Sequence, residues 1–252
     1  MENQVATHTT TESKFKFPTE MVDLPSKGLL YSEGNPLSTG KVEMKYMTAK
    51  EEDILTNQNY IKKGIVIDKL LESLITSPIN YNDLLIGDKN AIMIAARVLG
   101  YGKDYTFMYN GEETTIDLSE IESKLVREDL IVRGKNEFEF TLPHSKNKIT
   151  FKLLTHGDEK SIDREIEGLK KINKNVSQDL STRMKHVITS VNGNYETKDV
   201  RDFVGNYMLA KDSRALREYI KEVQPDIDLN VTLDSGEEIS LPITMNFFWP
   251  DF

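Results

Sequence analysis

Residues 83–100 read DLLIGDKNAIMIAARVLG, and this stretch decides the fold. A helix that is apolar around almost its whole circumference is usually the buried centre of a domain. Gly100 and Gly102 then suit the left-handed conformation that ends many helices. We therefore expect a central, buried helix with the other elements packed around it. Its apolar residues are Ile92, Met93, Ile94, Ala95, Ala96, Val98 and Leu99.

Two shorter helices are predicted before the central one. Residues 48–51 read TAKE, the spacing of a capping box, in which a threonine hydroxyl and a glutamate carboxylate satisfy free backbone amides. A helix of about nine residues should follow. Residues 65–75 read IVIDKLLESLI and place leucines at helical spacing on one face, and Pro78 ends this segment.

Three later segments alternate apolar and polar residues, which is typical of half-buried strands. Residues 104–117 contain Asn110-Gly111, a pair suited to the positive φ angles of a tight hairpin turn. A second hairpin is predicted from Glu137, in EFEFTLPHSKNKITFKLL, and a third near the C-terminus around Ser235-Gly236. The expected fold is therefore α+β, a mostly helical body with two or three β-hairpins, including one near the C-terminus.

An amphipathic stripe is expected between residues 158 and 191. Its spacing is close to a heptad pattern, and the segment forms either one long helix or two helices broken near 173–175. Its face packs on its own domain or on a partner helix. The stripe consists of Ile162, Ile166, Leu169, Asn173, Val176, Leu180, Met184, Val187 and Val191. Further helices are predicted at 197–208 and at 212–223, the second with Asp212 as its N-cap.

The pattern suggests four parts. Residues 1–16 are expected to be a flexible tail, and residues 17–47 an extended arm and a strand. Residues 48–118 should form the helical core with the first hairpin. Residues 119–252 should hold the second hairpin, a helical region and the C-terminal hairpin, either separately or as one continuous domain with 48–118.

Composition excludes several classes of protein. The chain has 252 residues, no cysteine, 32 Lys+Arg and 41 Asp+Glu, for a net charge of −9. Disulfides, thiolate zinc sites and thiol nucleophiles are therefore excluded. The acidic balance disfavours nucleic-acid binding, and no apolar run approaches the ~20 residues of a membrane span. The amino end lacks the apolar core of a secretory signal.

No pattern in the sequence indicates catalysis. His8, His144, His156 and His186 are scattered and are expected on the surface. The GYGK string at 100–103 follows a helix, whereas a phosphate-binding loop follows a strand. Most carboxylates lie beside lysines on faces expected to be solvated. We therefore expect no enzyme, no cofactor and no metal site, with an unrecognised hydrolase as a remote alternative.

Three apolar features are candidate partner-binding surfaces, and each could also dock on its own chain. The first is the arm, the second is the stripe, and the third is the aromatic terminus FFWPDF. Trp and Phe dominate buried interface cores, which is why the terminus stands out. The candidate residues are Phe17, Leu24, Leu29, Leu30 and Tyr31 in the arm, Leu169 and Val176 in the stripe, and Phe247, Phe248, Trp249 and Phe252 in the terminus.

Six strings together resemble the baseplate hub family of T-even-type contractile-tailed bacteriophages. The likeness runs from about residue 24 to the end; it is most specific in the first half, and residues 119–195 carry little of it. The strings are LPSKGLLY at 24–31, KYMTAKEEDILT at 45–56, IKKGIVIDKLLESLI at 61–75, YNDLLIGDKNAIMIAARVLGYGKDY at 81–105, DSRALREYIKEVQPDID at 212–228 and LPITMNFFWPDF at 241–252.

The resemblance implies a non-enzymatic hub protein that binds other baseplate or hub proteins during assembly of a contractile tail, with self-association also open. Such a protein is made in the host cytoplasm and is expected in the tail baseplate of the virion. The alternative is a transient hub assembly chaperone, absent from the finished virion. Some relatives carry paired cysteines in their hairpins, but this chain has none, so no zinc is expected.

Overall fold

The computed structural model describes residues 18–172, 178–233, 236–243 and 247–249, and these form a mixed α+β fold, as predicted. The predicted tail at 1–16 lies outside the described residues. The helices are α1 (Ala49–Leu55), α2 (Gln58–Lys62), α3 (Val66–Leu74), α4 (Ile86–Tyr101), α5 (His156–Ile172), α6 (Asp179–Val187), α7 (Thr197–Asp202) and α8 (Ala210–Val223). The strands are β1 (Thr19–Asp23), β2 (Lys41–Lys45), β3 (Asp104–Tyr109), β4 (Glu112–Asp117), β5 (Phe138–Thr141), β6 (Lys148–Phe151), β7 (Ile188–Val191), β8 (Asn230–Thr232) and β9 (Glu238–Ser240).

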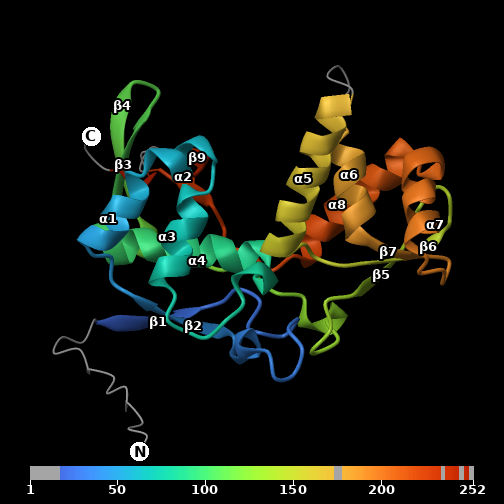
Figure 1. Cartoon of the computed structure of the whole chain (residues 1–252), viewed down its shortest axis with the longest axis horizontal. Coiled ribbons are helices and arrows are strands. Elements are labelled where there is room, and N and C mark those ends of the chain that lie inside the picture. Colours follow the sequence, from blue (N-terminus) through green and yellow to red (C-terminus); the bar gives the residue numbers. More distant parts are fainter. Residues whose placement is uncertain (1–17, 173–177, 234–235, 244–246, 250–252) are drawn as a thin grey trace, which may run out of the picture.

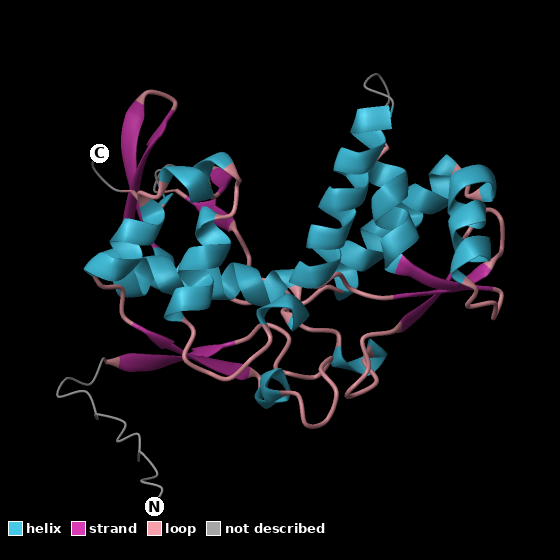
Figure 2. Cartoon of the chain, viewed as in Figure 1, coloured by secondary structure: helices cyan, strands magenta, loops and turns pink. Residues whose placement is uncertain are grey.

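The strands form small antiparallel sheets around the helices. β1-β2, β3-β4 and β8-β9 are two-stranded sheets, and β5-β6-β7 is three-stranded. Figure 1 shows α1–α4 grouped with the three two-stranded sheets, whereas α5–α8 gather above the three-stranded sheet. After α8 the chain returns to the first group, so the C-terminal hairpin packs beside the central helix rather than beside α5–α8. Figure 2 shows the loops that connect the two groups.

The central helix is α4, and its burial agrees with its composition. Ile92 and Ala96 are fully buried, and Met93, Ala95, Val98 and Leu99 pack partly buried against the same core. The helix continues through Gly100 to Tyr101 and ends at Gly102, whose φ of 86° and ψ of 172° favour glycine but differ from the expected left-handed cap. One contiguous apolar core includes side chains from both groups of elements.

The predicted capping box is present at the start of α1. Thr48 Oγ1 donates to Glu51 Oε2 at 2.6 Å, and Lys45 Nζ and Ser73 Oγ donate to Glu51 Oε1 at 2.8 and 2.7 Å. Burial alone would raise the pKa of Glu51, but these hydrogen bonds outweigh burial and lower the pKa to about 2. Glu51 therefore joins β2, α1 and α3 through one fully buried carboxylate.

A second buried carboxylate, that of Asp88, attaches the arm to the central helix. Ser26 donates to it from its backbone N–H and its hydroxyl, at 2.9 and 2.7 Å, and Tyr31 OH donates at 2.6 Å. Tyr31 OH in turn accepts a hydrogen bond from Leu85 N at 2.9 Å. Burial raises the pKa of Asp88 against the opposing effect of these donors. The arm is thus an integral part of the fold.

The amphipathic stripe forms two helices and a strand. α5 and α6 are separate helices, so the two-helix alternative is the correct one, and Asn173 lies outside the described residues. The last residues of the stripe form β7, which pairs with β6 next to a register shift at Thr150/Phe151. The continuation of the helical pattern to Val191 was therefore wrong. The β-branched residues of ITSV favour a strand at the open edge of the second hairpin.

We predict that Tyr31→Phe destabilises the protein by about 2 kcal/mol, because it removes a hydrogen bond to a buried carboxylate and leaves the Leu85 N–H unpaired. Urea unfolding would measure the change. Tyr207→Phe is the matched control, since the Tyr207 side chain is 66% exposed. Equal stability of the two variants would contradict the proposed role of the Tyr31 hydroxyl.

Candidate interaction surfaces

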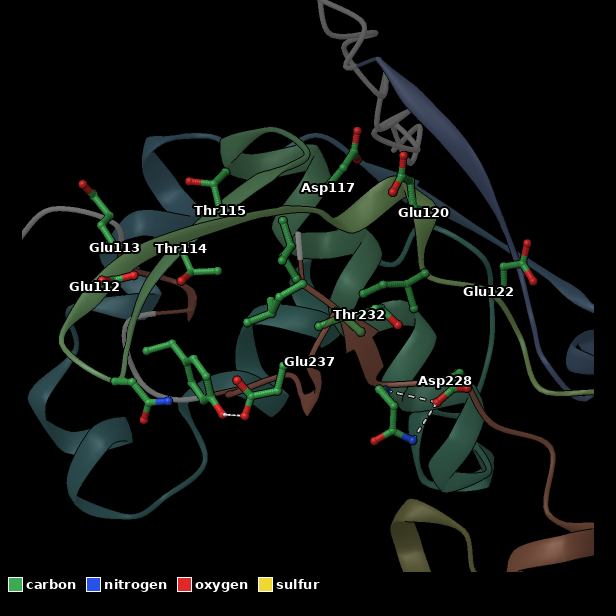
Figure 3. A pocket seen from close by; sticks show the side chains of 17 residues that line it. Glu112, Glu113, Thr114, Thr115, Asp117, Glu120, Glu122, Asp228, Thr232 and Glu237 are labelled. Atoms are coloured by element: carbon green, nitrogen blue, oxygen red, sulfur yellow. Dashed lines mark hydrogen bonds between the residues drawn. The ribbon is translucent and has the colours of Figure 1, made fainter. Parts of the chain in front are cut away.

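A groove with a volume of about 920 Å³ lies between the hairpins β3-β4 and β8-β9. Figure 3 shows side chains of β4 along one side of it and Asp228, Thr232 and Glu237 along the other. The described residues that line it are strongly acidic and include no lysine or arginine. The acidic residues that line it are Glu112, Glu113, Asp117, Glu120, Glu122, Asp228 and Glu237.

Contacts between distant segments close both ends of this groove. At one end, Ser123 and Ile227 form an antiparallel β-bridge. At the other end, Tyr109 OH donates to Glu237 Oε1 at 2.8 Å. The residues that follow β4 and those that precede β8 therefore meet, while β4 and β8 themselves stay unpaired with each other. No sequence pattern indicated this groove, because it depends on two hairpins more than 100 residues apart.

The predicted docking residues of the arm pack within this chain. Leu24, Leu30 and Tyr31 are 2%, 3% and 7% exposed, and Leu29 is half-buried. Phe17 lies outside the described residues. Leu24, Leu30 and Tyr31 thus dock on the same chain, and their side chains belong to its apolar core.

The aromatic terminus also docks on its own chain. Phe247 and Phe248 are 0% and 1% exposed, and the Phe247 ring meets the Tyr105 ring of β3 edge-on, with centroids 5.0 Å apart. Tyr105 OH donates to the Pro242 carbonyl at 2.9 Å. Trp249 packs partly buried against the core, and Phe252 lies outside the described residues. These contacts fasten the C-terminal segment to the first hairpin.

The stripe leaves apolar surface uncovered at the end of α5 and the start of α6. Leu169 is half-buried, whereas Ile172 and Leu180 are 85% and 47% exposed. Val176 lies outside the described residues. Figure 1 shows this end of α5 at the outer end of the α5–α8 group, away from the three-stranded sheet. We call Leu169, Ile172 and Leu180 the α5–α6 tip.

A buried histidine was missed by the sequence-based interpretation. His156 is 4% exposed, so the expectation that all four histidines lie on the surface was wrong. Its Nδ1 lies 3.2 Å from Lys89 Nζ, and its Nε2 lies 3.7 Å from Asp68 Oδ2. Tyr81 packs edge-on against the imidazole and donates to Asp68 at 3.1 Å. The signal for this burial is not local, since the cluster joins α3, α4 and α5.

The protonation state of His156 follows from these neighbours. Burial and the positive charge of Lys89 lower its pKa. Because an ammonium group has no acceptor, Nδ1 must accept from Lys89, and the proton of the neutral ring is on Nε2, toward Asp68. These residues do not line the acidic groove, and their contacts join α3, α4 and α5. The cluster therefore serves as a joint between helices.

Comparisons with protein families, curated proteins and solved structures find no match to this chain. Among the residues that the structure describes, no helix is long and apolar enough to cross a membrane. Within the same residues, no group of three or more histidine, aspartate or glutamate side chains is placed to hold a metal ion.

We predict that His156 makes the free energy of unfolding depend on pH. A depressed pKa in the folded state means that the unfolded state binds the proton more readily, so this stability is present above the unfolded pKa of about 6.5 and is lost as the pH falls toward the folded pKa. Urea unfolding between pH 7.5 and pH 5.5 should show a steeper loss for the wild type than for His156→Gln. Parallel profiles would refute this role.

Proposed function

We propose that this chain is a non-enzymatic baseplate hub protein of a contractile-tailed bacteriophage, which binds other hub proteins during tail assembly. The proposal rests on the resemblance of six strings to that family. The observation that carries it is the way these strings meet in space, because the likeness then describes one connected unit rather than unrelated fragments.

The contacts between the strings support this reading. The first string docks on the fourth through Ser26, Tyr31 and Asp88. The second reaches the third through Glu51 and Ser73. The fourth holds the fifth through the hydrogen bond from Asn90 to Asp226, at 3.0 Å. It also holds the sixth, through Tyr105 and Pro242 in one contact and through the rings of Tyr105 and Phe247 in another.

The test is a nonsense mutation of this gene in the phage that encodes it. A hub function predicts lysates with heads but no complete tails, as seen by electron microscopy, and rescue when the intact chain is supplied from a plasmid. Normal tails in the absence of the chain would refute the proposal. Mass spectrometry of purified virions then separates the two forms of it, since a permanent subunit is present in the particle and a transient assembly factor is absent.

A second candidate function is that of a chaperone that shields an aggregation-prone hub protein. The exposed apolar side chains of the α5–α6 tip favour it, because Ile172 and Leu180 are exposed and lie outside the apolar core formed by the described residues. This tip belongs to the segment 119–195, which carries little of the family likeness. A specialised partner surface there would therefore be peculiar to this chain.

For this second function, we predict that Ile172→Glu abolishes the ability of the chain to keep a co-expressed hub protein soluble, while its own melting temperature stays unchanged. The reason is that Ile172 is 85% exposed and contributes little to the core. The matched control is Lys171→Glu, which changes the charge by more but removes no apolar side chain. Equal loss of solubilisation with both variants would contradict apolar shielding.

A further inference from the structure

The acidic groove runs between two strand edges that pair with no other strand in the described part of the chain. Consecutive residues of β4, from Glu112 to Asp117, line it, and so do the consecutive residues 230–233 at β8. Successive side chains of a strand point to opposite faces, so a groove lined by all of them follows the edge of the strand. Among the residues that the structure describes, β4 pairs only with β3, and β8 only with β9.

The register identifies which backbone groups of β4 face the groove. Asn110 and Gly111 have φ of 50° and 88°, as in a two-residue turn, so Tyr109 and Glu112 exchange hydrogen bonds across the hairpin. In an antiparallel pair, hydrogen-bonded and non-hydrogen-bonded positions alternate. The hydrogen bond from Leu118 N to Lys103 O, at 2.8 Å, fits this alternation. The backbone N–H and C=O groups of Glu113, Thr115 and Asp117 therefore point outward, toward the groove.

The same reasoning applies to β8. Leu233 N donates to Glu237 O at 2.8 Å, and Leu241 N donates to Leu229 O at 2.7 Å, so positions 229, 231 and 233 face β9. Asn230 and Thr232 consequently direct their backbone groups to the other edge. The Asn230 N–H is already used by Asp228 Oδ1, at 3.0 Å. Thr232 thus offers both of its backbone groups, and Asn230 offers its carbonyl.

The side chains of the groove specify the chemistry of an occupant. Ile116, Ile121, Val231 and Leu233 provide apolar surface among the seven carboxylates, of which Asp117 forms an ion pair with Lys103. The described lining residues include no basic side chain. The side chains of Glu112, Glu113, Glu120 and Glu122 make no hydrogen bond or ion pair with the described part of the chain. Such a surface favours cationic groups and repels phosphate.

We propose that this groove binds an extended segment of another polypeptide, in which lysine or arginine alternates with β-branched residues. The segment adds as a strand to the open edge of β4 and meets the edge of β8 across the groove. Main-chain hydrogen bonds supply affinity, as in other cases of strand addition, and the carboxylates select basic side chains. This proposal stands on the groove alone and does not depend on the hub function.

The test measures binding of the synthetic peptide KVKTKVKTKV, acetylated and amidated, to the full chain by isothermal titration calorimetry. Thr115→Pro should weaken binding by about tenfold, because it removes an N–H that faces the groove. Thr106→Pro is the matched control: Thr106 is paired with Thr115, its backbone faces the opposite edge, and both variants lose the same hydroxyl contact of 2.8 Å. The control should bind like the wild type.

A second measurement needs no variant of the protein. The same peptide with alternate backbone amides N-methylated keeps every charge but loses main-chain donors, and its binding should also fall by about tenfold. With the unmodified peptide bound, hydrogen exchange should slow at the amides of Glu113, Thr115, Asp117 and Thr232. The proposal is overturned by absence of binding up to about 1 mM peptide. It is equally overturned by binding that survives N-methylation, since charge attraction alone would then account for it.

Discussion

The burial of the Asp88 carboxylate is the constraint on which the first half of the structure depends. A buried carboxylate without donors is costly, and the donors for this one come from Ser26 and Tyr31, 62 and 57 residues earlier in the chain. The arm must therefore fold back on α4 to satisfy it. Leu24 directly follows β1 of the arm, β1 pairs with β2, and β2 places Lys45 beside Glu51.

A carboxylate occupies the same position near the start of other helices. Glu51, Asp68, Asp88, Asp158 and Asp212 each occupy the third residue of their helix. A carboxylate in the first turn gains from the helix dipole, and here each also accepts a hydrogen bond from another element or from the residues just before the helix. Asp212, which is fully buried, accepts from His144 N and Ser145 N at 2.8 and 3.0 Å, and so ties α8 to the turn between β5 and β6.

The features that were predicted correctly from the sequence depend on residues that lie close together in the chain. The capping box at Thr48 and Glu51 and the turn at Asn110-Gly111 each involve residues within one turn of backbone, so their pattern is complete in the sequence. The sequence-based interpretation placed most carboxylates on solvated faces and took Asp212 for an N-cap. α8 instead begins at Ala210, and burial of Asp212 depends on a turn 67 residues away. A single sequence does not encode such a distance in any local pattern.

The candidate surfaces also differ in whether a local sequence pattern or only the assembled fold reveals them. The arm and the terminus were recognised because apolar residues are concentrated there. Composition alone does not determine whether they dock on the same chain. The structure shows that they do, through contacts with Asp88 for the arm and with Tyr105 for the terminus. The groove was missed because it is made of backbone edges, which any alternating sequence can provide. Only the assembled topology reveals that β4 and β8 end up facing each other without pairing.

The carboxylates that contribute to the net charge of −9 include two contrasting groups. Those at the third helical position, Glu51, Asp68, Asp88, Asp158 and Asp212, accept hydrogen bonds from donors inside the chain and so hold elements together. Around the groove, Asp117, Asp228 and Glu237 also accept hydrogen bonds, whereas the side chains of Glu113 and Glu120 make none with the described residues and add negative charge to the groove. Like charges gathered along open strand edges lower stability, but they also discourage pairing between two copies of this acidic edge. The acidic groove therefore favours binding of a basic strand over pairing with a second copy of the same acidic edge. The negative charge thus reduces the risk of aggregation and makes the surface selective.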